Sequence, residues 1–160
     1  MAADIFAKIA NIKGESNDVK HKDEIDVLSW AWGVSQSGTV AHGSGGGEGK
    51  ASFHDLTFTH RIDKATPLLL KACATGTHVP DATITVRKAT QDKPEFLIVK
   101  LTDVVVTSVS MSVDRDDPTT VENVTLQFGK VDFEYKAQKQ DGSLEPGLHF
   151  VYDIAANKVG

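Results

Sequence analysis

The chain has 160 residues, of which 40% are hydrophobic and 24% are charged, and its formal net charge at pH 7 is −5. This length suits one domain with its own core, so we expect a single domain over residues 1–160. The lysines are scattered and the balance is acidic, which argues against the basic patch of proteins that bind nucleic acid or anionic lipid. No stretch approaches the eighteen or so apolar residues that span a bilayer, so we expect no membrane insertion.

The N-terminal stretch lacks the basic start, the continuous apolar run and the cleavage site of a secretory signal peptide. We therefore expect a protein that is made and folded in the cytoplasm. Cys73 is the only cysteine, so an internal disulfide is impossible and a structural zinc site would lack a second thiolate.

Most segments alternate apolar and polar residues between turn signals, which predicts an all-β domain closed as a barrel or a sandwich. Eight strands are predicted, over residues 4–12, 24–34, 52–62, 81–89, 95–101, 104–113, 121–136 and 148–154.

The second predicted strand carries both tryptophans of the chain. Alternation places Leu28, Trp30 and Trp32 on one side, which we interpret as the core side. The other side holds Val27, Ser29 and Ala31, which are small and only mildly polar. This side either lines a space or contacts a neighbour, or it is a second buried face within the monomer.

A glycine-rich segment with a Gly–Lys pair follows this strand. A phosphate-binding P-loop needs glycine five residues before that pair's glycine and Ser or Thr after the lysine, but Ser44 and Ala51 stand there. The dinucleotide-binding pattern also fails, because Glu48 stands where its third glycine belongs. Both motifs open a helix, whereas a strand pattern follows here. The segment is interpreted as a loop between two strands.

One segment has helical signals. Thr66 is the predicted N-cap, Pro67 fits the first helical position, and Gly76 ends the pattern. Leu69, Leu70 and Cys73 share one face, so Cys73 is interpreted as a core residue rather than a reactive thiol. The further residues assigned to the core are Phe58, Leu126 and Phe128.

The predicted strand 121–136 changes phase once. Its apolar residues fall on even positions up to Phe128 and on odd positions from Val131 onward. Gly129 lies at the change, which predicts a β-bulge that bends a long strand along a curved wall.

Local motifs for catalysis or metal binding are absent from the sequence. The six histidines form neither His-Glu-x-x-His nor His-x-His, and the acidic turn after Val113 lacks the glycine and glutamate of a calcium loop. We therefore expect no metal, no cofactor and no enzymatic activity. The enzymatic alternative is a hydrolase whose groups come from separate strands, with four candidate residues: His54, Asp55, His60 and Asp63.

Several stretches together resemble the Hcp family, the haemolysin-coregulated proteins of the bacterial type VI secretion system. The matching stretches run nearly end to end, in the family's order, over residues 13–16, 24–33, 35–38, the glycine-rich loop, 62–67, 85–89 and 122–126. The resemblance implies a mainly β fold, a barrel of two sheets with one short flanking α-helix. It also implies hexameric rings that stack into a tube resembling a phage tail tube.

The resemblance also implies roles for particular residues. The glycine-rich loop would contact neighbouring subunits and stack one ring on the next; its residues are Thr39, Val40, Ala41, His42, Gly43, Ser44, Gly45, Gly46, Gly47, Glu48, Gly49 and Lys50. The side with Val27, Ser29 and Ala31 would face the ring lumen, where family members hold effector proteins.

The implied partners are further copies of the chain, a VgrG spike, sheath and baseplate proteins, and effectors. The implied path is export from the cytoplasm without a signal peptide, when the sheath contracts. A monomeric ligand-binding β-barrel is the main alternative, because its strands would follow the same pattern.

Overall fold

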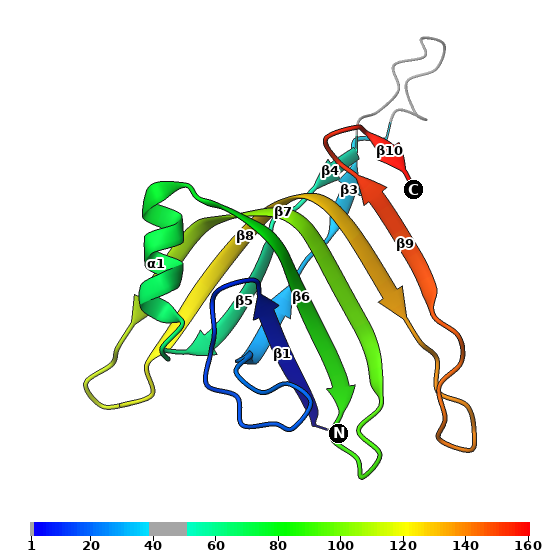
Figure 1. Cartoon of the computed structure of the whole chain (residues 1–160), viewed down its shortest axis with the longest axis horizontal. Helices are drawn as coiled ribbons and strands as arrows, with labels where there is room; N and C mark the ends of the chain where they lie inside the picture. Colours follow the sequence, from blue (N-terminus) through cyan, green and yellow to red (C-terminus); the bar gives the residue numbers. More distant parts are fainter. Residues whose placement is uncertain (1, 39–50) are drawn as a thin grey trace.

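The computed structural model describes residues 2–38 and 51–160 and shows a mainly β fold with one short helix (Figure 1). Within the described residues the elements are β1 (Ala3–Ile9), β2 (Ile25–Ala31), β3 (Val34–Gln36), β4 (Ala51–Phe53), β5 (Leu56–Arg61), α1 (Thr66–Thr75), β6 (His78–Lys88), β7 (Glu95–Ser112), β8 (Val121–Tyr135), β9 (Leu148–Asp153) and β10 (Lys158–Val159).

Six antiparallel strands close a barrel in the order β8-β5-β2-β1-β6-β7, because β7 pairs back with β8. Strands β9 and β10 extend the sheet outward from β8, and β3 and β4 form a separate two-stranded ribbon. In Figure 1 this ribbon lies beside the turn between β9 and β10, at the opposite side of the molecule from α1. The predicted β-barrel with a single flanking helix is confirmed.

Several strand boundaries differ from the predicted ones. The predicted strand 24–34 ends at Ala31 in β2, with Val34 already in β3, and the predicted strand 52–62 is broken into β4 and β5, because the chain leaves the barrel there to form the ribbon. The two strands predicted over 95–101 and 104–113 form one 18-residue strand, β7. The short strand β10 was not predicted.

The core lies inside the barrel and beneath α1. Phe58, Leu69, Leu126 and Phe128 are buried there, and Trp30, Trp32 and Cys73 are partly buried against them. The helix buries Leu69 and Ala72, whereas Leu70 is exposed, so the predicted inclusion of Leu70 in the buried face is wrong.

The start of α1 also differs from the prediction. Thr66 does not cap the helix; its Oγ1 instead accepts a hydrogen bond from the backbone N–H of Asp63 at 3.2 Å. The Asp63 carboxylate in turn accepts from the N–H of Ala65 at 2.8 Å. The predicted end is correct, because Gly76 has a left-handed φ of 64° that suits glycine.

The predicted change of phase in β8 is confirmed, but its cause is a kink shared by two strands. Buried positions switch from even to odd numbers across Gly129 in β8, and from odd to even numbers across Asp103 in β7. Thr102 pairs with Lys130 and Val104 pairs with Phe128, so both strands carry one extra residue at the same level and the register is unchanged. A one-sided bulge would have shifted that register.

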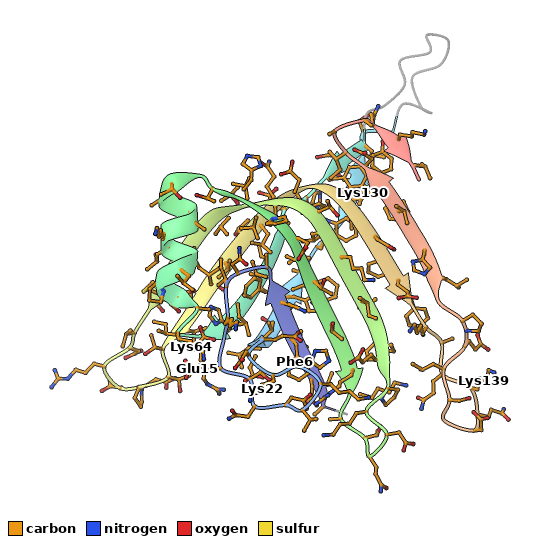
Figure 2. All side chains as sticks on the ribbon, viewed as in Figure 1. Phe6, Glu15, Lys22, Lys64, Lys130 and Lys139 are labelled. Atoms are coloured by element: carbon orange, nitrogen blue, oxygen red, sulfur yellow. The ribbon has the colours of Figure 1, made fainter. Side chains whose placement is uncertain are left out.

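Residues 10–24 form a strap along the outside of β1 and β6. Arg87 of β6 holds it with two hydrogen bonds to the Asp18 carboxylate, at 3.0 and 2.5 Å, and also donates to Asp4 on β1. Hydrogen bonds from Arg87 hold the pKa of Asp18 far below its usual value. The strap also reaches the segment before α1, where the Glu15 carboxylate accepts a hydrogen bond from the backbone N–H of Lys64 at 2.8 Å (Figure 2).

The close approach of the strap to the start of β2 requires glycine at position 14. A Cβ at Gly14 would lie 2.6 Å from the carbonyl oxygen of Glu24 and 2.7 Å from Cα of Ile25. These are backbone atoms that no side-chain rotation can move, so Gly14→Ala is expected to lower the free energy of unfolding by about 1–3 kcal/mol, measured by urea titration. Gly129→Ala is the matched control, because its Cβ would meet Asp103 at an ordinary 3.5 Å. Equal losses in the two variants would contradict this description of the strap.

Candidate functional site

A β-bulge in β2 exchanges the predicted roles of two residues. The register with β5 shifts between Val27 and Ser29, so Leu28 is the extra residue and the alternation inverts after it. Val27 is therefore buried in the core and does not line an outer surface, and Leu28 is 44% exposed and does not belong to the core. Ser29 and Ala31 point away from the core, as predicted, and both are exposed.

Two rows of small side chains cross four strands on the outward face of the barrel. In the first row Ser29 pairs with Thr59, Thr59 with Asn123, and Asn123 with Ser110. The second row follows the same strands through Ala31, Thr57, Thr125 and Ser108. Cross-strand partners in register share a face. We call these eight residues the hydroxyl face.

The hydroxyl face carries no charged side chain, and six of its eight residues are exposed. Its hydroxyls and amide give it short hydrogen-bonding groups that leave the wall smooth. One bond fixes its centre, where the Thr59 hydroxyl donates to the Asn123 side-chain oxygen at 2.7 Å.

Sequence reasoning found only Ser29 and Ala31 of this face. The remaining six residues are Thr57, Thr59, Ser108, Ser110, Asn123 and Thr125. The available signal was three short runs in which small polar residues alternate with apolar ones, Thr57-Phe58-Thr59, Ser108-Val109-Ser110 and Asn123-Val124-Thr125. Each run resembles an ordinary half-buried strand, and only the register shows that they line up.

The glycine-rich loop, from Thr39 to Lys50, lies outside the described residues. The ribbon of β3 and β4 that flanks it is described and lies apart from the six-stranded barrel (Figure 1).

The proposed catalytic residues fall into two separate places. His60 is fully buried; its Nε2 lies 2.9 Å from the carboxylate of Glu122, which is also fully buried, and its Nδ1 lies 3.7 Å from Asp63. Burial alone would lower the pKa of His60, but the two carboxylates outweigh it and the pKa is raised. A substrate in solvent has no access to a fully buried imidazole, so we interpret this cluster as structural.

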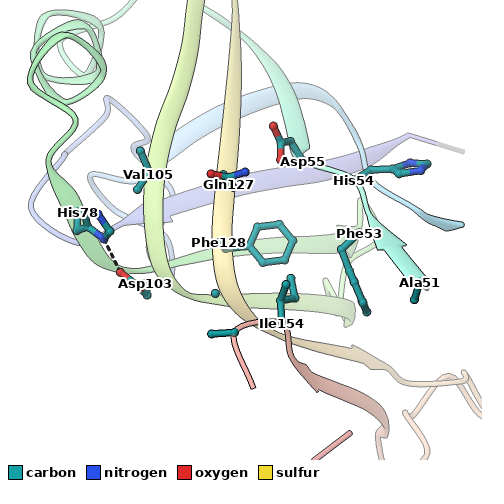
Figure 3. A pocket seen from close by; sticks show the side chains of 12 residues that line it. Ala51, Phe53, His54, Asp55, His78, Asp103, Val105, Gln127, Phe128 and Ile154 are labelled. Carbon is teal, nitrogen blue, oxygen red and sulfur yellow. Dashed lines mark hydrogen bonds and ion pairs between the residues drawn. The ribbon is translucent and has the colours of Figure 1, made fainter. Parts of the chain in front are cut away.

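His54 and Asp55 instead line an open pocket of about 350 Å³ above the kink (Figure 3). Its far wall holds His78, whose Nδ1 lies 2.7 Å from the Asp103 carboxylate. In Figure 3 the His54 ring points away from this pair. The described lining residues include no Ser, Thr, Cys or Lys that could act as a nucleophile beside the pair. Among the residues that the structure places, no group of three His, Cys, Asp or Glu is arranged to hold a metal ion.

Comparisons with known proteins agree with this architecture. The model of the family "Type VI secretion system effector, Hcp" matches residues 6–135. The chain belongs to the Hcp family. It is 49% identical over 159 residues to Protein hcp1 of Pseudomonas aeruginosa, covering 98% of both chains.

Solved structures agree with the family membership along the whole chain. Hcp1 from Salmonella typhimurium superposes with a TM-score of 0.82 at 43% identity, covering 100% of both chains. A structure described as a type six secretion system protein gives a TM-score of 0.92 at 30% identity, covering 99% of this chain and 100% of that one. The chain is thus a β-barrel member of a family of type VI secretion tube proteins.

None of the described helices is long and apolar enough to cross a membrane.

The buried His60–Glu122 pair predicts a pH dependence of stability. The folded pKa of His60 lies above its usual 6.5, so its contribution is complete below pH 6.5 and is lost as the pH rises through the folded value. Deprotonation leaves Glu122 and Asp63 beside a neutral ring. We expect the free energy of unfolding, from urea titrations between pH 6 and 9, to fall with rising pH.

The matched control replaces both partners, His60→Leu with Glu122→Leu, because an apolar pair of similar volume is often neutral for stability. This double variant should lose the part of the pH dependence that comes from His60. Single Glu122→Leu should cost about 3–5 kcal/mol, because it strands the charged partner. Identical pH profiles for the wild type and the double variant would show that the pair is not the titrating element.

Proposed function

We propose that this chain is the ring-forming subunit of a type VI secretion inner tube. Six copies form a ring, rings stack into a tube, and the hydroxyl face of each copy faces the lumen. The single observation that carries this proposal is the pair of small-residue rows that crosses four strands without a charged side chain, in a member of the Hcp family.

An uncharged, smooth wall suits the holding and release of cargo. Charged walls would bind some effectors tightly and repel others, since paired charges attract strongly at short range. Hydroxyl and amide groups make weak, exchangeable contacts with folded proteins of either sign. We therefore expect effectors to be retained by many weak contacts inside a closed space rather than by one strong site.

Ring formation requires that one flank of each copy contacts a different flank of the next copy. The molecule has distinct flanks, with α1 on one and the β9–β10 extension on the other (Figure 1). The loop of residues 39–50 is proposed to make the contact between stacked rings, because it continues the ribbon that lies apart from the barrel.

The proposed path follows from this assembly. The tube forms in the cytoplasm inside a contractile sheath on a baseplate, carries a VgrG spike at its tip, and is expelled without a signal peptide when the sheath contracts. The subunit then needs no catalytic site, since contraction supplies the work. The monomeric ligand-binding barrel is less well supported, because side chains such as Phe58, Leu126 and Val131 fill the barrel interior.

The native mass tests this function. Light scattering on the purified protein should give about 103 kDa, six times the 17.2 kDa of one chain, with ring-shaped particles in negative-stain images of the same peak. A monomer of 17.2 kDa at every concentration, together with saturable binding of a small molecule, would favour the ligand-binding barrel and refute the tube proposal.

A further inference from the structure

The ribbon of β3 and β4 is not part of the barrel ladder. Its three residue pairs join Val34 to Phe53, Ser35 to Ser52 and Gln36 to Ala51, and within the described residues neither strand pairs with a barrel strand. A two-stranded ribbon of this length is only marginally stable by itself. Something other than strand pairing must therefore fix its direction.

One fixing contact is made by Trp32, the first of the two residues between β2 and the ribbon. Its indole N–H donates to the carbonyl oxygen of His54 at 2.9 Å, so it joins the two ends of the ribbon. The N–H of His54 also donates to the carbonyl of Gly33 at 3.0 Å. The indole ring lies 6.2 Å from both Phe128 and Phe133, which stand on either side of the kink in β8.

The second fixing contact is Phe53, the last residue of the ribbon. Its ring centre lies 4.4 Å from that of Tyr152 on β9. The Tyr152 hydroxyl donates to the side-chain oxygen of Asn157 at 2.6 Å, in the turn between β9 and β10. Tyr152 is thus held by its own hydrogen bond and offers a fixed surface to Phe53.

We propose that three aromatic residues position the ribbon and thereby the ring-to-ring contact. We call them the aromatic seat: Trp32, Phe53 and Tyr152. The inference rests on the proposed function for its consequence in tube assembly. In this arrangement the C-terminal strand pair β9–β10, outside the closed barrel, supports the segment that leads to the glycine-rich loop. Phe53 and Tyr152 act as positioning residues, and neither needs to touch the neighbouring ring.

The test measures the ribbon's direction and tube assembly separately. Nitroxide labels at Gln36→Cys on β3 and Lys100→Cys on β7, in a Cys73→Ala background, report the ribbon-to-barrel distance by pulsed electron spin resonance. Labelled chains are diluted with unlabelled ones so that each ring carries one pair. We expect one narrow distance distribution, lost in Phe53→Ala and restored in Phe53→Tyr, because the tyrosine ring rebuilds the contact with Tyr152.

Assembly is then compared by electron microscopy and light scattering. Phe53→Ala should keep the ring mass and lose stacked tubes, whereas Phe53→Tyr should keep both. The matched control is Phe96→Ala, which truncates another partly buried phenylalanine, on β7, and should leave the distance distribution and the tubes unchanged.

A narrow, unshifted distribution together with normal tubes in Phe53→Ala would overturn the proposal. Thermal unfolding of each variant shows whether Phe53→Ala merely lowers the stability of the fold. If Phe96→Ala changes the distance distribution as much as Phe53→Ala does, the change reflects a general loss of stability and the proposal fails. If the wild type forms no rings, the proposed function fails, while the spin-label comparison in the monomer still decides whether the aromatic seat positions the ribbon.

Discussion

The two long strands β7 and β8 bend together where Asp103 faces Gly129, and the rest of the architecture depends on this paired kink. Each strand carries one extra residue at the same level, so the ladder between them continues in register while their inward faces exchange. Before the kink β8 pairs with β5, and after it β8 pairs with β9. The kink thus lies between the part of β8 that closes the barrel and the part that supports the outward extension.

The hydroxyl face and the ribbon, the two proposed functional elements, both depend on how the kink divides β8 into two halves. The half of β8 that precedes the kink carries Asn123 and Thr125 in the rows of the hydroxyl face. The half that follows it supports β9 and so places Tyr152 beneath the ribbon. Trp32 bridges the halves by packing on Phe128 and Phe133. The hydroxyl face and the ribbon are therefore set relative to each other by one local deformation.

The fold class, the helix and the phase change at Gly129 could be predicted because each leaves a local periodic signal. Proline and glycine marked the helix ends, and apolar residues moved from even to odd numbers in β8. The bulge at Leu28 left a similar signal that was missed: the apolar residues move from odd positions, Ile25 and Val27, to even ones from Leu28 onward, and the register with β5 shifts there. Val27 and Leu28 were assigned to the wrong sides for this reason. Glu122 was missed as the partner of His60 because the two are 62 residues apart, and cross-strand register alone brings them together.

The most direct test of the central claim asks whether the hydroxyl face is enclosed in the assembled tube. In a Cys73→Ala background, Ser110→Cys places a thiol on that face, and Lys100→Cys places one on the exposed surface of β7 outside that face. In stacked tubes, Ser110→Cys should react with N-ethylmaleimide but be protected from a maleimide carried on a large polyethylene glycol, whereas Lys100→Cys should react with both. Equal labelling of both sites by the large reagent would contradict the account, because the hydroxyl face would then lie on the outside.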